Sequence, residues 1–310
     1  MGRKGRKRRP PLPANLGHPR YWGTWFGLGL LRLLNHLPIP LLNRLADGLG
    51  ILVRGLLPER RHIARVNLEL AFPDYSEHER RRLERNTFKA AGRGLMEGGL
   101  AWWAAEARLA PRYTIEGLNH LEEARAQGRG VILLGGHYST LEISGRLLAR
   151  HVEELYPIYK PAKNPAFNAT MLKSRRRTFA DVLRNDDMRA IVRVLRRGGV
   201  VWYAPDQDFG RKGSVFAPFM GVETATLTMT ARLARVSGAP MVPFYSERRP
   251  GHCWHLELAP VLEDFPSGDD VADAARINKT IEHQVRRTPE QYLWIHRRFK
   301  TRPERREQLY

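Results

Sequence analysis

The sequence predicts an α/β protein with a mixed, mainly parallel central sheet flanked by helices. Two short apolar runs, at 131–136 and 200–205, are rich in Val, Ile and Leu or in Val and aromatics, as buried strands are. Between them, residues 184–197 place apolar side chains on one helical face and arginines on the other. Strands that alternate with helices are connected by crossovers, which favours parallel pairing.

Apolar periodicity and turn residues also predict the remaining helices and strands. The pattern of residues 59–110 predicts basic helices. From residue 113 onward the pattern predicts alternating strands and helices. We expect further strands at 113–118, 155–161, 239–247 and 253–261, and helices at 121–128, from about 140, and at 271–287.

The N-terminal region divides into two parts ahead of a single α/β domain at 59–310. Residues 1–20 are predicted to be a basic, disordered arm, since the first ten contain six Lys or Arg. Residues 21–58 are apolar with aromatics at the leading end, and the uncharged run stops at Arg32. That run is shorter than the roughly 20 apolar residues of a spanning helix. We expect a helical membrane anchor lying in or near the plane of the bilayer, with buried helices of a soluble fold as the alternative.

The composition of the chain excludes several classes of protein. The 310 residues carry a net charge of +20, one Cys and a mean hydropathy of −0.46. These values exclude a disulfide framework, a Cys-rich zinc module and a polytopic membrane protein. The charge calls for an acidic partner: nucleic acid, an anionic membrane, a phosphorylated substrate or an acidic carrier protein.

The strongest local feature is GGHYSTLE, at the junction of the strand at 131–136 and the helix that follows. His137 lies in this turn, where ligands of open α/β sheets collect, and the two glycines remove side chains that would block substrate. Glu142 in the first helical turn can reach back to one ring nitrogen and leave the other as a general base. It also fits a capping box with Ser139, so spacing alone leaves its role open.

Two further clusters are weaker. Residues 173–177, KSRRR, are either a solvated face or a clamp for phosphate or developing negative charge. Residues 204–221 start at a strand's carboxyl end with Asp206 and Asp208 and run into Phe-Ala-Pro-Phe, a mixture suited to a ligand with polar and apolar parts. The sequence lacks the GxSxG elbow, the P-loop and the HExxH zinc motif.

Taken together, the ordered blocks resemble the bacterial lipid A biosynthesis lauroyl/myristoyl (late) acyltransferases of the lysophospholipid acyltransferase superfamily. The matching stretches are RHIARVNLELAFPD, GGHYSTLE, YKPAKNPAFN, VVWYAPDQDFG, SVFAPFMGV, TARLARVSGAPMVPF and PEQYLWIHRRFKTRPE. They span about 20–304. The resemblance implies a glycerolipid acyltransferase-like fold and transfer of a lauroyl or similar chain from acyl carrier protein. The acceptor that the resemblance implies is a hydroxyacyl chain of a Kdo-bearing, tetra-acylated lipid A precursor.

The resemblance also implies a place and a set of partners. The enzyme is expected at the cytoplasmic face of the bacterial inner membrane, in contact with acyl-acyl carrier protein, the lipid A precursor and inner-membrane lipid. We expect no nucleic acid, cofactor or metal. The family variant HxxxxE, with Glu142 where glycerolipid enzymes have Asp, argues against the alternative of a glycerolipid or lysolipid acyltransferase. No helix-turn-helix, RNP or zinc-finger signature supports the other alternative, a nucleic-acid-binding protein.

Carried over by position, the catalytic residues are His137, Glu142, Arg175 and Asp206, although the register of the arginine run also allows Arg177. His137 is expected to take the proton of the acceptor hydroxyl while Glu142 orients it. Arg175 or a backbone N–H after the glycines is expected to stabilise the oxyanion. The expected substrate-binding residues are Arg177, Asp208, Ser214 and Phe216.

Overall fold

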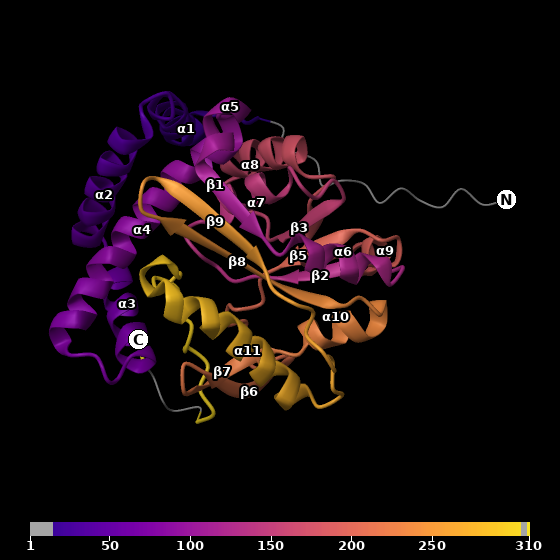
Figure 1. Ribbon diagram of the computed structural model, residues 1–310. Helices are drawn as coiled ribbons and strands as arrows, with labels where there is room; N and C mark the ends of the chain where they lie inside the picture. The colour runs from indigo at the N-terminus through magenta and orange to yellow at the C-terminus, as the bar shows by residue number, and fades with distance from the viewer. Residues whose placement is uncertain (1–14, 305–308) are drawn as a thin grey trace.

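A computed structural model describes residues 15–304 and 309–310 and contains a central seven-stranded sheet and a separate two-stranded one (Figure 1). The strands of the large sheet, in order across it, are β1 (Tyr113–Glu116), β9 (Cys253–Leu258), β8 (Met241–Arg249), β2 (Val131–Leu134), β5 (Val200–Tyr203), β3 (Leu155–Tyr159) and β4 (Leu183–Arg184). Only β8 and β9 pair antiparallel, while the other neighbours are parallel. The predicted mixed, mainly parallel sheet is therefore confirmed.

The two faces of the sheet build two hydrophobic cores. Because side chains alternate along a strand, Val131 and Leu133 of β2 face one core, whereas Ile132 and Leu134 face the other. Helices on the first side are α1 (Trp22–Leu34), α2 (Ile39–Leu56), α5 (Glu106–Leu109), α6 (Leu118–Ala126), α7 (Leu141–Leu148) and α8 (Pro165–Thr178). Helices on the second side are α3 (Pro58–Ala71), α9 (Met188–Arg196), α10 (Met229–Ser237) and α11 (Asp270–Arg287). The long helix α4 (Glu77–Trp103) contributes to both cores.

The two-stranded sheet was not predicted. Strands β6 (Ser214–Phe219) and β7 (Val222–Leu227) form an antiparallel hairpin that begins inside the 204–221 cluster, where no strand was expected. Its two-residue turn, Met220 and Gly221, has positive φ at both positions, as a type I′ turn requires. Pro218 lies inside β6, and proline normally indicates a break in a strand, so the sequence pattern hides the hairpin.

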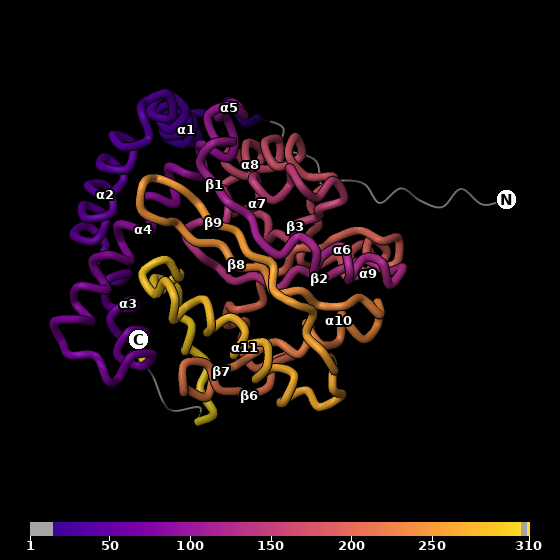
Figure 2. The backbone as a smooth tube through the Cα atoms, in the orientation of Figure 1, coloured from indigo at the N-terminus to yellow at the C-terminus, as the bar shows by residue number. Residues whose placement is uncertain are grey.

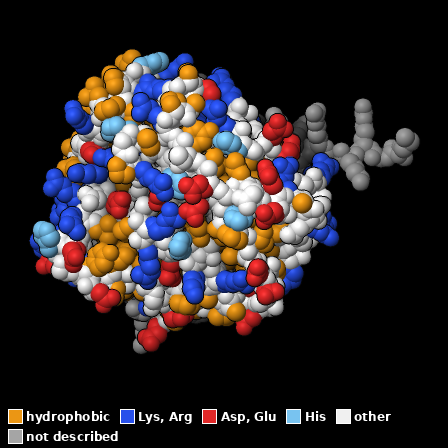
Figure 3. Space-filling view, in the orientation of Figure 1, with side chains coloured by type: hydrophobic (Ala, Val, Ile, Leu, Met, Phe, Trp, Pro, Cys, Tyr) orange, Lys and Arg blue, Asp and Glu red, His pale blue; other side chains and the backbone are white. Residues whose placement is uncertain are grey.

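The first two helices pack on the domain with one side and expose apolar side chains on the other. Buried Leu31 and Leu42 contribute to the first core. Of the fifteen exposed large apolar side chains among the described residues, ten belong to this region: Trp22, Trp25, Phe26, Leu30, Leu33, Leu41, Leu45, Leu52, Leu56 and Leu57. In the upper left of Figure 3, over α1 and α2, hydrophobic side chains accordingly gather on the surface. Among the described residues, no helix is both long and apolar enough to span a bilayer.

The end of the chain returns to the N-terminal helices. Figure 2 shows the C-terminus beside α3, and the Tyr310 hydroxyl donates a hydrogen bond to Asn67 of that helix. Asn67 in turn donates to the carbonyls of Trp294 (2.6 Å) and His296 (2.7 Å). These contacts hold the segment after α11 against the body of the domain. Most of the predicted arm, residues 1–14, lies outside the described part.

Candidate active site

His137 and Asp206 meet because their strands are neighbours in register. Strands β2 and β5 are parallel and pair Leu134 with Tyr203, the last residue of each. His137 and Asp206 each follow three positions later, so both side chains lie beyond the same edge of the sheet. The main-chain N–H of Gly135 donates to the carbonyl of Tyr203 at 2.9 Å, which extends the register toward the site.

The imidazole and carboxylate form a two-point contact. Nδ1 of His137 donates to Oδ1 of Asp206 at 2.6 Å, and the main-chain N–H of His137 donates to Oδ2 at 2.9 Å. An ionised carboxylate only accepts hydrogen bonds, so the proton lies on Nδ1 and Nε2 is the free base. The Asp206 side chain is 1% exposed, whereas that of His137 is 30% exposed and faces a cavity. The geometry presents Nε2 to a ligand.

The pKa values of the pair move apart. Burial by itself lowers the pKa of His137, but the charge of Asp206 and its hydrogen bond outweigh burial and raise this pKa above its ordinary value. Burial likewise raises the pKa of Asp206, yet the charge and hydrogen bonds of His137, with a smaller contribution from Arg298, lower it overall. The carboxylate is therefore ionised near neutral pH and stabilises an imidazolium beside it.

The turn that carries His137 is fixed by the chain after α11. The carbonyl of His137 accepts from the N–H of Leu293 at 3.0 Å, and the N–H of Ser139 donates to the carbonyl of Gln291 at 2.7 Å. The glycines before His137 have a different use from the one expected. A Cβ on Gly135 would lie 2.7 Å from Nε1 of Trp202, and one on Gly136 would lie 2.8 Å from the ring of Tyr138. They allow close packing of aromatic side chains under the turn.

Glu142 does not contact His137, which corrects the expected pairing. It forms an ion pair with Arg175 of α8 and accepts a hydrogen bond from Nε1 of Trp102 in α4 at 2.9 Å. The alternative capping box is not formed either, since Thr140 is the N-cap of α7 and makes no side-chain capping bond. Spacing along the chain suggested that Glu142 would contact the histidine. In the structure, the register of β2 and β5 places Asp206 at Nδ1 of the ring instead.

A cavity of about 480 Å³ opens at the free side of the imidazole. Its volume falls within the roughly 300–1,000 Å³ typical of small-molecule sites. Most of its lining is apolar or aromatic and comes from the ends of β3 and β5 and from α8, α9 and α10: Pro157, Ile158, Tyr159, Met171, Phe179, Met188, Ile191, Trp202, Tyr203, Met229 and Leu233. Polar side chains are few: His137, Glu142, Lys160, Arg175, Asn185 and Gln207. Such a cavity suits a ligand with a long apolar part that reacts at one end.

The chain is similar to known proteins over nearly its whole length. The family model described as "Bacterial lipid A biosynthesis acyltransferase" matches residues 10–301. The chain belongs to this family. It is 42% identical to the lipid A biosynthesis palmitoleoyltransferase of Escherichia coli (strain K12) over 295 residues, covering 94% of this chain and 96% of that protein. It is also 42% identical to the lipid A biosynthesis lauroyltransferase of the same strain over 297 residues, covering 95% and 97%.

Identity to the lipid A biosynthesis myristoyltransferase of that strain is 32% over 313 residues, covering 97% of this chain and 96% of that protein. The protein is thus an acyltransferase of lipid A biosynthesis. The two 42% relatives are named for different acyl chains. Overall similarity therefore does not identify the chain that this acyltransferase prefers.

The four expected catalytic residues of this lipid A acyltransferase come together in the structure, as two pairs: His137 with Asp206, and Glu142 with Arg175. Of these, only Asp206 is not among the residues lining the cavity. Arg175 rather than Arg177 faces the site, since Arg177 is exposed at the surface of α8. Of the three adjacent arginines, the structure thus brings Arg175 to the cavity.

The four expected substrate-binding residues lie elsewhere. Arg177, Asp208, Ser214 and Phe216 are all outside the lining of the cavity. Asp208 is buried and accepts hydrogen bonds from the N–H of Thr301 (2.7 Å), its hydroxyl (2.9 Å) and the N–H of Gly210 (2.8 Å). It therefore fastens the loop after β5 to the C-terminal segment. Ser214 and Phe216 belong to the β6–β7 hairpin, where Arg211 stacks over the Phe216 ring.

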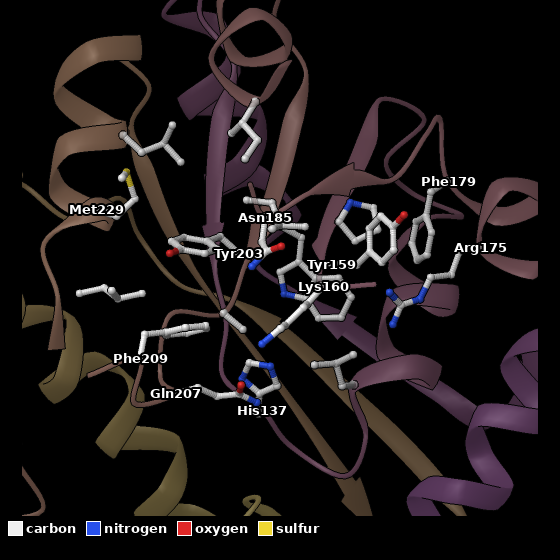
Figure 4. Close-up of a pocket in the computed structure, with 18 of the residues that line it drawn as sticks. His137, Tyr159, Lys160, Arg175, Phe179, Asn185, Tyr203, Gln207, Phe209 and Met229 are labelled. Atoms are coloured by element: carbon white, nitrogen blue, oxygen red, sulfur yellow. The ribbon is translucent and has the colours of Figure 1, made fainter. Parts of the chain in front are cut away.

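Lys160 is a functional candidate that sequence reasoning missed. It is the residue immediately after β3, the strand next to β5, so it shares the sheet edge with His137. In Figure 4 its ammonium group points toward the imidazole. The strand expected at 155–161 included Lys160, whereas β3 ends at Tyr159. The sequence therefore did not show that Lys160 lies at the carboxyl end of a parallel strand, where functional side chains collect.

Proposed function

We propose that the protein transfers a lauroyl or similar acyl chain from acyl carrier protein to a hydroxyl of a hydroxyacyl chain on a Kdo-bearing, tetra-acylated lipid A precursor. The observation that carries the proposal is the free Nε2 of His137 at the wall of an apolar cavity, with Nδ1 held by Asp206. The cavity accommodates the acyl chain, and the imidazole lies where the thioester carbonyl and the acceptor hydroxyl meet.

In the proposed reaction Nε2 of His137 removes the proton of the acceptor hydroxyl as its oxygen attacks the thioester carbonyl. The imidazolium that forms is stabilised by Asp206. Collapse of the tetrahedral intermediate breaks the C–S bond, and the proton passes from Nε2 to the departing thiolate. General base catalysis of this kind contributes about 10²- to 10⁴-fold to the rate.

The expected hydrogen-bond donors to the oxyanion, Arg175 or a backbone N–H after the glycines, have other partners in the structure. The N–H groups of His137 and Ser139 donate to Asp206 and Gln291, so the main chain after the glycines is engaged elsewhere. Arg175 is paired with Glu142. We assign stabilisation of the oxyanion to Lys160, whose ammonium group points toward the imidazole of His137 in Figure 4. The pair of Glu142 and Arg175 then positions the acceptor lipid, with Glu142 holding the guanidinium in place.

The apolar surface of α1 and α2 supports association with the bilayer from one side. Such a surface is far richer in large apolar side chains than the rest of the molecule, and helices of this type lie in the membrane interface. Asn164 at the start of α8 donates to Thr24 of α1 at 2.8 Å, so the helix that carries Arg175 is joined directly to α1. We place the enzyme at the cytoplasmic face of the inner membrane, where the precursor reaches the cavity along α1 and α8.

One assay tests this function. Purified protein is incubated with acyl-acyl carrier protein and the lipid A precursor, and the glycolipid is followed by mass spectrometry. The proposal predicts a mass gain of one acyl chain that is lost in His137→Ala. No gain with any of several chain lengths, or an equal gain in His137→Ala, would reject it.

A further inference from the structure

A second cavity, of about 700 Å³, lies between α9 and α10 and carries a concentration of positive charge. Five arginines line it: Arg189, Arg193, Arg196, Arg197 and Arg232. The other lining residues are apolar: Met188, Val192, Met229, Leu233 and Val236. We call this feature the arginine groove. Its lining contains no carboxylate, so it combines an apolar floor with a rim of one sign of charge.

The charge of the arginine groove is not neutralised within the chain. In the described residues, 15–304 and 309–310, none of the five guanidinium groups has a carboxylate within 4.0 Å, and all five side chains are exposed. Arg235, also on α10, differs, since it lies within 4.0 Å of carboxylate oxygens of Asp270 and Asp273. Unpaired like charges repel each other, and an acidic partner relieves this repulsion.

The groove adjoins the catalytic cavity. Met188, Met229 and Leu233 line both spaces. In Figure 4, Met229 lies toward one side of the catalytic cavity and Phe179 toward the other, with His137 between them. A flexible arm that entered past Met229 would therefore bring its end to His137 and leave the space near Phe179 for an acyl chain.

From the charge and this continuity, we propose that the arginine groove docks the acidic surface of the acyl carrier protein. This inference rests on the proposed function, which makes that protein the donor. The carrier contributes carboxylates to the arginine rim, and its thioester-bearing arm passes from the groove into the catalytic cavity.

The position of the groove favours a protein over a membrane. Helices α9 and α10 lie on the opposite side of the molecule from α1 and α2, whose apolar surface is the one suited to a bilayer (Figure 1). A bilayer that covers α1 and α2 leaves the groove facing away from it. The two substrates then approach from different sides and meet at His137.

The test compares two double variants of the full-length enzyme. Arg193→Glu with Arg232→Glu reverses charge in the groove, whereas Arg82→Glu with Arg85→Glu makes the same change at exposed positions of α4. Initial rates are measured against acyl-acyl carrier protein at saturating acceptor. We expect the groove variant to raise KM for the carrier about tenfold or more with little change in kcat, and the α4 variant to behave as the unmodified enzyme. An unchanged KM in the groove variant, or an equal rise in both variants, overturns the proposal.

A second pair of variants and a vesicle assay distinguish loss of carrier binding from loss of lipid binding and from misfolding. Arg189→Gln with Arg197→Gln removes charge more gently, and we expect an intermediate rise in KM that diminishes as salt is added. Flotation with vesicles of anionic phospholipid should be the same for all variants. A loss of vesicle binding confined to the groove variants overturns the proposal in favour of a lipid site. If the unmodified enzyme forms no product from the carrier, the proposed function fails instead, which is a separate result.

Discussion

Oδ1 of Asp206 lies 2.6 Å from Nδ1 of His137, although 69 positions separate the two residues in the sequence. The contact follows from the parallel pairing of β2 with β5, whose last residues, Leu134 and Tyr203, face each other. It makes Asp206, rather than Glu142, the partner that orients the imidazole.

Replacing Asp206 with Asn should lower kcat by about 10²- to 10⁴-fold. The amide is nearly the same shape, but it has only one oxygen for the two donors of His137, the ring Nδ1–H and the main-chain N–H. Initial-rate kinetics measures the effect, and a thermal melt of the variant checks that it is folded. A folded Asp206→Asn enzyme with near-normal kcat would show that the contact has no catalytic part.

Glu142 and Arg175 should behave as one unit. Glu142→Gln and Arg175→Gln each remove the same ion pair, so the double variant should lose little more activity than either single one. The coupling expected for a partly buried pair is about 1–3 kcal/mol. A double-mutant cycle on kcat/KM for the acceptor measures it. Additive losses would mean that the two side chains act independently.

The cavity should set the length of the acyl chain. Met171 of α8 lines it, and Met171→Trp fills part of its space. Competition between donors of different length should then shift toward shorter chains by about tenfold or more, as expected when one end of an apolar pocket is blocked. Product masses from a mixed donor pool give the ratio. An unchanged ratio with a folded variant would place the acyl chain outside this cavity.

Membrane association should depend on the exposed side of α1. Phe26 and Leu33 are 74% and 67% exposed, so changing both to Ser leaves the core intact. Each large apolar side chain transferred from water contributes about 1.5–3 kcal/mol, and the double variant should therefore bind vesicles at least about tenfold more weakly. Val271→Ser on α11, 49% exposed, is the matched control. Equal vesicle binding by all three proteins would exclude α1 as the contact surface.

Much of the fold could be predicted from the sequence because the apolar pattern of each helix or strand lies within that element. The apolar runs at 131–136 and 200–205 lie on β2 and β5, and the amphipathic stretch at 184–197 contains α9. Helix α8 was not assigned, although Asn164 and Pro165 give a clear start: Asn164 caps it and Pro165 occupies its first turn. The β6–β7 hairpin was missed because a proline stands within one strand.

The site was harder to predict because it depends on strand order. All four proposed catalytic residues were identified by resemblance to the family, yet their pairing was wrong. Spacing along the chain brought Glu142 to His137, whereas register across the sheet brings Asp206. Lys160 was overlooked for the same reason, since nothing local in the sequence shows that β3 lies beside β5.

The measurement that tests the account most directly is the pH dependence of acyl transfer in three proteins. His137 acts as a base only when Nε2 is unprotonated, so kcat/KM should rise with pH through the pKa of His137. Asp206 raises that pKa above 6.5, and without the carboxylate only the lowering effect of burial remains. We expect an ascending limb centred above pH 6.5 in the unmodified enzyme and in Glu142→Gln, and one moved to lower pH in Asp206→Asn. A shift in Glu142→Gln with none in Asp206→Asn would contradict it.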